Sequence, residues 1–388
     1  MVDGDPSQQP PSSIGQKLNV PLLVFVYAVS GLLLVLHARS LISSGGDPWR
    51  QGDWLINYSA GPVRRGISGE FFLALSQTWN VDPLALVVGV QLCISLLIAG
   101  VLLRKAVRLN APDHLTIALL APTLVVFWVN DPGAMFRKEI LYFLALAPLT
   151  FEIGSRSKEF FVSASAILIY AIAVAFHEST AFFAGFLVLA FITRYREALP
   201  LARIGTIAAI AAIGVLYAVS FASVPDTAPI CNRLIAAGLD ARICSGIIVF
   251  LQEGVAGNFE VVAANFEASS IAEGLSVGIL CLMPTAYLLI YSPRTVRILQ
   301  IALASILLMP LFLLSIDWGR WLSAFAFSVV MLLLVPNNGR PVRATFPLPL
   351  YILGLVVFLS VGLNHSVVLF ADGFAVSLTK TLISLFGG

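Results

Sequence analysis

The chain has 388 residues, of which 59% are hydrophobic and only 11% are charged, and its formal net charge at pH 7 is +2. Soluble domains carry about 25% charged residues, so this composition excludes an ordinary soluble fold. The small net charge excludes the basic footprint of a nucleic-acid-binding protein, and the sequence has no Walker-type loop, dinucleotide fingerprint or paired-cysteine zinc spacing.

Residues 1–16 are rich in Pro, Ser and Gln and lack the basic start of a signal peptide. We therefore expect a disordered cytoplasmic tail over 1–16, followed by a single transmembrane domain over 17–388.

Many apolar runs follow the tail, and a spanning helix needs about 20 mostly apolar residues. The runs predict an all-α polytopic transmembrane bundle of about 11 spans, near 20–41, 84–103, 115–130, 139–154, 160–176, 181–194, 204–223, 274–292, 299–316, 321–336 and 347–364.

Two long connections, about 43–83 and 224–273, fall on one side of this bundle. We expect interfacial helices in both, and in the first the amphipathic stretch from about Gly66 to Trp79 is the candidate. The second contains Cys231 and Cys244, for which a disulfide and two free thiols are equally compatible with the sequence.

The basic residues orient the bundle by the positive-inside rule. With the N-terminus in the cytoplasm, 13 of the 23 basic residues lie inside, in short connections such as RKAVRLN and NNGRPVR. We therefore expect a multi-pass protein of a bacterial inner membrane, with a cytoplasmic N-terminus and both long connections in the periplasm.

Ionisable side chains near a bilayer are costly and are therefore default candidates for function. Five groups of them stand at the predicted outer ends of the spans: Asp47/Arg50/Asp53 with Arg64/Arg65/Glu70; Asp131 with Arg137/Lys138/Glu139; His177/Glu178; Asp317/Arg320; and His365. Their common side predicts one polar cavity that opens outward.

Arginine suits phosphate because its planar fork matches two oxygens at once. An Arg-rich cavity at the lipid interface indicates a site for a lipid-linked phosphate or diphosphate, and the chemistry that fits is glycosyl transfer with a diphosphate leaving group. The candidates to bind it are Arg64, Arg65, Arg137, Lys138 and Arg320, with Asp317 and Glu178 beside them. Asp317 and Arg320 are equally compatible with a simple i,i+3 ion pair.

The transfer also needs a base for the acceptor hydroxyl. The sequence offers His177, Asp53 and Asp47 for that role and does not choose among them. No cofactor is expected. A divalent metal at Asp131, Glu139 and Glu178 stays open, although no ligand spacing argues for one.

One stretch of the chain resembles a known family. FRKEILYFLALAPLTF, a short basic turn and AFHESTAFF resemble the Wzy/EpsG-type exopolysaccharide polymerases over roughly residues 130–190, and Arg137, His177 and Ser179 occupy the matching positions. Lys138 stands where that family often has an amide. The resemblance implies polymerisation of undecaprenyl-diphosphate-linked oligosaccharide repeat units into exopolysaccharide or O-antigen at the periplasmic face. Expected partners are that lipid-linked glycan, the bilayer, and polysaccharide-export or chain-length proteins, with no nucleic acid.

Two alternatives remain. The segment DPWRQGDW…EFFLAL resembles the first outer loop of GT-C glycosyltransferases, which implies addition of a single sugar from a polyprenyl-phosphate donor, with Asp47 or Asp53 as the base. The other alternative is a flippase of lipid-linked glycans. Because the ionisable residues stand at span ends on one face, and no internal repeat is evident, the sequence favours an enzyme.

Overall fold

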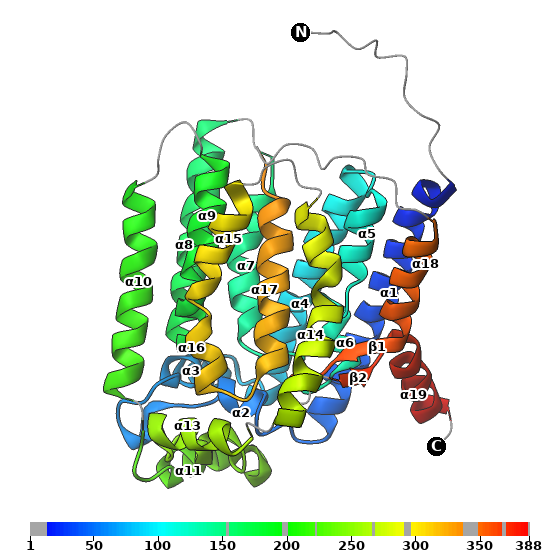
Figure 1. Ribbon diagram of the computed structural model, residues 1–388. Coiled ribbons are helices and arrows are strands. Elements are labelled where there is room, and N and C mark those ends of the chain that lie inside the picture. The colour runs from blue at the N-terminus through cyan, green and yellow to red at the C-terminus, as the bar shows by residue number, and fades with distance from the viewer. Residues whose placement is uncertain are drawn as a thin grey trace.

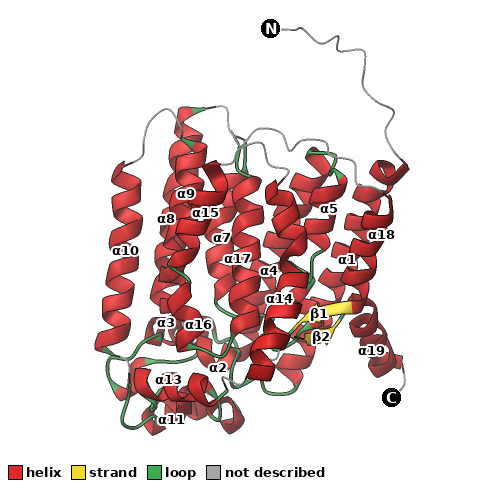
Figure 2. Cartoon of the chain, in the orientation of Figure 1, coloured by secondary structure: helices red, strands yellow, loops and turns green. Residues whose placement is uncertain are grey.

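The structure is a computed structural model that describes residues 14–152, 155–195, 201–221, 223–265, 268–290, 296–336, 348–366 and 370–386. Its described part is a bundle of roughly parallel helices with shorter helices gathered at one end (Figures 1 and 2). Most of the tail predicted over 1–16 lies outside the described residues, but the first helix already begins at Ile14.

The elements follow one another in this order: α1 (Ile14–Ser43), α2 (Gln51–Trp54), η1 (Tyr58–Ala60), α3 (Gly66–Trp79), α4 (Pro83–Arg108), α5 (Asp113–Leu120), α6 (Phe127–Asn130), α7 (Glu139–Leu146), η2 (Ala147–Thr150), α8 (Arg156–Phe176), η3 (Glu178–Phe183), α9 (Ala184–Arg194), α10 (Leu201–Ser220), α11 (Ala228–Ala236), η4 (Ala241–Cys244), α12 (Ile247–Phe250), α13 (Gly254–Ala264), α14 (Ala268–Ile290), α15 (Val296–Ile306), α16 (Met309–Leu314), α17 (Trp318–Leu333), α18 (Leu348–Ser360), β1 (Val361–Leu363), β2 (Phe370–Asp372) and α19 (Phe374–Phe386).

Five of these helices, α1, α4, α8, α10 and α14, contain stretches long and apolar enough to cross a membrane. The helical membrane bundle is therefore confirmed, whereas the count of about 11 spans is not. The other predicted spans form shorter or interrupted helices. Proline explains two of the interruptions, because it lacks an amide hydrogen and disfavours helix in the residue before it. Ala121 is extended before Pro122, and Pro310 lies in the first turn of α16.

The two long connections pack together at one end of the bundle, and we call residues 44–82 and 223–265 the cap (Figure 1). Ile247 N donates to Pro48 O over 3.3 Å, and Arg233 pairs with Glu70 at 2.5 Å, so both halves of the cap are joined. The first half contains a helix with the predicted bounds, α3. In the second half α14 begins at Ala268, so the connection is shorter than the predicted 224–273. Helix α1 starts at the opposite end of the bundle.

A disulfide joins Cys231 to Cys244 and ties α11 to η4. The question that the sequence left open is thereby answered in favour of the bond.

The chain also contains a small antiparallel hairpin of two three-residue strands, which adds to the predicted helical bundle and ends the last predicted span, 347–364, early. Helix α18 ends at Ser360, and β1 pairs with β2 with Val361 opposite Asp372. Gly362 makes the close pairing possible, because a Cβ there would lie 2.1 Å from the carbonyl oxygen of Asp372. A strand of three residues carries too little periodicity to be read from an apolar run.

Candidate functional site

A cavity of about 590 Å³ lies where the cap meets the ends of α8, α10, α16 and α17. Each of the five sequence groups contributes to its wall. The ionisable side chains that line it are Asp47, Asp53, Arg64, Arg65, Arg137, His177, Glu178, Asp317, Arg320 and His365. Residues spread over more than three hundred positions of the chain are therefore brought to one place, as the sequence predicted.

The wall carries as many carboxylates as arginines. Arg64, Arg65, Arg137 and Arg320 face Asp47, Asp53, Glu178 and Asp317. This balance differs from the expected excess of cations. The arginines that remain free to bind an anion must therefore be found from their individual partners.

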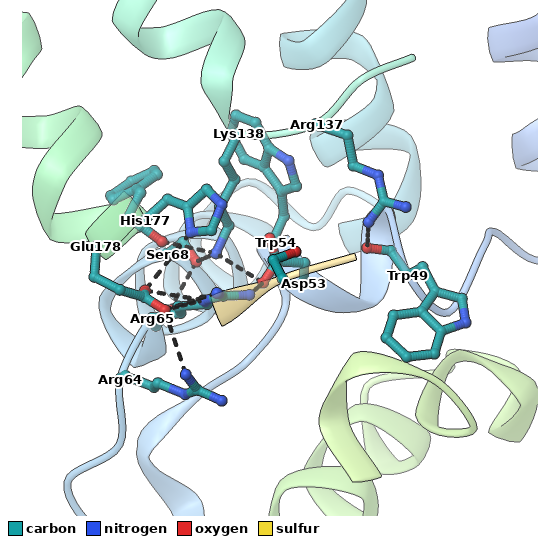
Figure 3. Close-up of polar contacts among 12 residues, drawn as sticks. Trp49, Asp53, Trp54, Arg64, Arg65, Ser68, Arg137, Lys138, His177 and Glu178 are labelled. Carbon is teal, nitrogen blue, oxygen red and sulfur yellow. Dashed lines mark hydrogen bonds and ion pairs between the residues drawn. The ribbon is translucent and has the colours of Figure 1, made fainter. Parts of the chain in front are cut away.

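Arg65 is the centre of a buried ion-pair network (Figure 3). Its Nε and Nη2 donate to the Glu178 carboxylate over 2.7–3.0 Å, and its Nη1 donates to Asp53 Oδ1 over 3.1 Å. Paired and bidentate hydrogen bonds of this kind fix the guanidinium in one orientation. Arg65 thus holds the first connection against the end of α8.

The sequence GPVRRGISG explains how the chain reaches this arrangement. Arg65 has a left-handed backbone with φ of 66°, an uncommon conformation for a residue with a side chain. The two following glycines let α3 start against the preceding loop: a Cβ on Gly66 would lie 2.3 Å from the Tyr58 ring, and one on Gly69 2.1 Å from the Ile56 carbonyl oxygen.

Lys138, expected to bind diphosphate, does not line the cavity. Its side chain is 0% exposed and lies behind Asp53 at 3.6 Å, and its Nζ donates to Ser68 Oγ over 3.0 Å and to Phe176 O over 2.9 Å (Figure 3). A lysine held by three partners away from solvent is a positioning group. It fixes the Asp53 carboxylate and cannot reach a ligand in the cavity.

The carboxyls of Asp53 and Glu178 are poor proton acceptors. Burial opposes ionisation of both, but Lys138 and Arg65 at Asp53, and Arg65 at Glu178, outweigh it and hold each pKa below its usual value. A general base works best when its pKa lies near the working pH. Asp47 is also engaged, because its carboxylate accepts hydrogen bonds from the amides of Trp49 and Arg50 and from the Arg50 side chain.

His177 lies between two carboxylates. Its Nε2 is 3.4 Å from Glu139 Oε1 and its Nδ1 is 3.6 Å from Glu178 Oε2, and its side chain is only 4% exposed. Neither nitrogen makes a hydrogen bond within the part of the chain that the structure describes. His177 touches the cavity, but both of its nitrogens face acidic neighbours.

Arg320 is also occupied. It pairs with Asp317 at 2.7 Å, the i,i+3 partner that the sequence offered, and with Glu139. Its guanidinium lies over the Trp321 ring, 5.1 Å from the ring centre. These contacts leave Arg320 little freedom to bind an added anion.

Arg137 is the arginine best placed to bind an anion. Its Nε donates to Gly133 O over 2.9 Å and its Nη1 to Trp49 O over 2.7 Å, both backbone carbonyls (Figure 3). Among the described residues no carboxylate lies within ion-pair distance of it. Arg64 is the second candidate: its nearest carboxylate is Glu178 at 3.6 Å, and its side chain makes no hydrogen bond to a described residue.

Most of the remaining cavity wall is apolar, and the sequence did not predict it. It comes from α10, α13, α16 and η3, through Phe182, Val215, Val219, Val262, Leu311 and Leu314. Aliphatic residues in long apolar helices give no signal that separates a cavity wall from a packing or lipid-facing surface.

Three comparisons with known proteins found no match to this chain. No protein-family model matches the chain, and neither a search of curated proteins nor a search of solved structures found a match.

Within the described ranges, no three His, Cys, Asp or Glu side chains gather where they would hold a metal ion.

Proposed function

We propose that the chain is a membrane glycosyltransferase that polymerises polyprenyl-diphosphate-linked oligosaccharide repeat units at the outer face of a bacterial inner membrane. The observation that carries this proposal is the mixed lining of the cavity. Arg137 and Arg64 line it together with apolar side chains of α10, α13 and α16.

A lipid-linked diphosphate needs both kinds of lining at once. Its phosphate oxygens favour a planar guanidinium that is not already neutralised by a carboxylate, which describes Arg137. Its isoprenoid chain favours apolar surface, because contact removes that surface from water. Val215 and Val219 of α10 supply such surface within the same cavity.

The transfer step then has a simple balance. The acceptor hydroxyl gives its proton to a base, and its oxygen forms a bond to the anomeric carbon of the donor sugar. The bond from that carbon to the diphosphate oxygen breaks, and the diphosphate leaves with the electron pair. Arg137 and Arg64 stabilise the negative charge that develops on the leaving group.

The position of the charged groups favours an enzyme over a flippase. The described ionisable residues of the cavity belong to the cap, to helix ends beside it or, for His365, to the turn after β1. A carrier that moves a charged headgroup between leaflets typically has its site near the middle of the membrane.

The single-sugar GT-C alternative is less favoured. It assigns the base to Asp47 or Asp53, and both carboxylates are already held by cations or by the local backbone.

The test is the glycan profile of a strain that lacks this gene. Accumulation of single, complete, lipid-linked repeat units in place of polymer supports the proposal. Repeat units that lack one sugar would contradict it and point to the GT-C alternative, and complete units confined to the cytoplasmic leaflet would point to a flippase.

A further inference from the structure

We propose that His365, oriented by Asp131, is the base that takes the acceptor proton. This inference rests on the proposed transfer function and names a residue for it other than His177, Asp53 or Asp47.

The two side chains form a tight dyad. His365 Nδ1 lies 2.7 Å from Asp131 Oδ2, and the same oxygen accepts the His365 backbone amide over 2.5 Å. The other oxygen, Oδ1, accepts the Gly133 amide over 2.9 Å. Since both carboxylate oxygens accept backbone N–H groups, Nδ1 is the donor of the dyad contact, and in the neutral imidazole Nε2 then carries the free lone pair.

His365 is more accessible than the other histidine of the wall. Its side chain is 29% exposed, against 4% for His177. Its Nε2 makes no hydrogen bond with any residue that the structure describes, and His365 lines the cavity. A base must reach the hydroxyl proton within hydrogen-bond distance, so access and a free lone pair decide between the two histidines.

The fold restricts the position of the His365 backbone. His365 follows β1 by two residues, in a turn where Asn364 Oδ1 accepts the Ser366 amide over 3.0 Å. Two glycines from other elements make room for the turn. A Cβ on Gly319 would lie 1.7 Å from Asn364 O, and one on Gly133 would lie 2.4 Å from His365 Cε1.

Arg137 lies close to the dyad along the chain and in the cavity wall. Its Nε is bonded to Gly133 O, and the Gly133 amide is bonded to Asp131. Arg137 and Asp131 of the dyad are therefore joined through one short stretch of backbone, residues 131–137. Since Arg137 and His365 line the same cavity, a donor diphosphate on Arg137 would lie in the cavity that His365 also lines.

The proton balance is complete within the step. Nε2 accepts the proton of the acceptor hydroxyl as its oxygen bonds to the anomeric carbon, and His365 becomes imidazolium while Asp131 stabilises the new charge. The diphosphate leaves with the electron pair of the broken carbon–oxygen bond. The proton on Nε2 then returns to water or to the departing diphosphate.

The test uses the full-length chain in the deletion strain and the purified protein. His365→Gln and Asp131→Asn are compared with wild type and with the matched control His37→Gln, whose histidine is on α1 and not in the cavity wall. One readout is the rate of polymer formation in a pulse-labelled culture, and the other is binding of undecaprenyl diphosphate to purified protein.

Both dyad variants are expected to slow polymer formation by about 100-fold or more, the usual size of a general-base contribution. Undecaprenyl diphosphate binding should stay within about 3-fold of wild type, because the dyad acts on the chemical step and not on donor binding. Retained binding also shows that the variants are folded.

Two results would overturn the inference, and they differ. If wild type restores polymer and His365→Gln restores it almost as well, the dyad is not the base while the proposed function stands. If wild type itself restores no polymer to the deletion strain, the proposed function fails, and the dyad assignment fails with it.

Discussion

Arg65 and Glu178 lie 113 positions apart in the chain, yet their side chains meet in a bidentate contact with hydrogen bonds of 2.7–3.0 Å. The contact joins the cap to the end of α8 and shapes one wall of the cavity. Because Asp53 accepts from the same guanidinium, the loss of Arg65 would leave Glu178 without its strongest partner and would remove one of the two cations that hold the buried Asp53 carboxylate.

Arg65→Ala is therefore expected to destabilise the protein by about 3–5 kcal/mol, the range for removal of one partner from a buried ion pair. Thermal unfolding in detergent measures the effect. Arg242→Ala is the matched control, because Arg242 pairs with Asp240 on the surface of the cap, where an exposed ion pair contributes little. Equal melting temperatures for Arg65→Ala and wild type would contradict the structural role of Arg65.

Arg137→Ala is expected to reduce polymer formation by about 100-fold or more, since removal of one donor from a charge-stabilising site commonly has an effect of this size. Arg137→Lys should restore only part of the lost polymer formation, because an ammonium group lacks the planar fork of a guanidinium. Chain-length profiles of the complemented deletion strain give the measurement. The exposed Arg39 of α1 provides a control arginine outside the cavity wall. A wild-type chain-length distribution for Arg137→Ala would refute the role of Arg137.

Reduction of the Cys231–Cys244 bond is expected to loosen the cap. The two cysteines are 13 positions apart, and closing a loop of about this length stabilises a fold by roughly 3 kcal/mol. Cys231→Ser should thus lower the unfolding temperature, whereas Cys93→Ser, at a free cysteine of α4, should leave it nearly unchanged. Mass spectrometry after alkylation checks the premise: four reactive thiols in unreduced protein, in place of two, would contradict the bond.

The Arg233–Glu70 ion pair between the two halves of the cap predicts that the stability of the fold depends on pH. Partial burial opposes the charge of Glu70, but hydrogen bonds from Arg233 and the Tyr58 amide outweigh it and hold its pKa below the usual value. A carboxyl with a lowered pKa stabilises the fold fully above its unfolded-state pKa, about 4.3, and this stabilisation is lost as pH falls through the folded-state pKa.

Glu70→Gln should therefore lower the unfolding temperature at neutral pH. Below about pH 4 its unfolding temperature should approach that of wild type. Thermal unfolding of both proteins in detergent across that range gives the comparison. A difference in unfolding temperature between wild type and Glu70→Gln that stays constant down to about pH 3 would show that the charge of Glu70 is not the source of the stabilisation.

Part of the fold follows directly from sequence patterns. Helix α3 has the bounds that its amphipathic pattern predicts, and α1, α4, α8, α10 and α14 coincide with long apolar runs. Interruptions such as the one before Pro122 were harder to foresee, because an apolar run looks the same whether or not its helix is continuous. The β1–β2 hairpin depends on a close approach at Gly362 that only the folded chain reveals.

Most ionisable members of the site were also predictable, since charged residues near a bilayer are rare enough to stand out. The contacts that each of these residues makes were not predictable from the sequence. Sequence placed Lys138 among the phosphate-binding residues, but the fold buries it behind Asp53. Asp131 and His365 were noted in separate groups, and only the fold places them 2.7 Å apart. Pairing between distant segments is a tertiary property, for which spacing along the chain gives no signal.

Reconstitution decides whether this chain transfers glycan from one lipid carrier to another. Purified wild-type protein is placed in proteoliposomes with lipid-linked repeat units extracted from the deletion strain, and the products are resolved by chain length. We expect polymer with wild type and with His37→Gln, and almost none with Arg137→Ala. Repeat units that remain single in the presence of folded wild-type protein would rule out the proposed transfer.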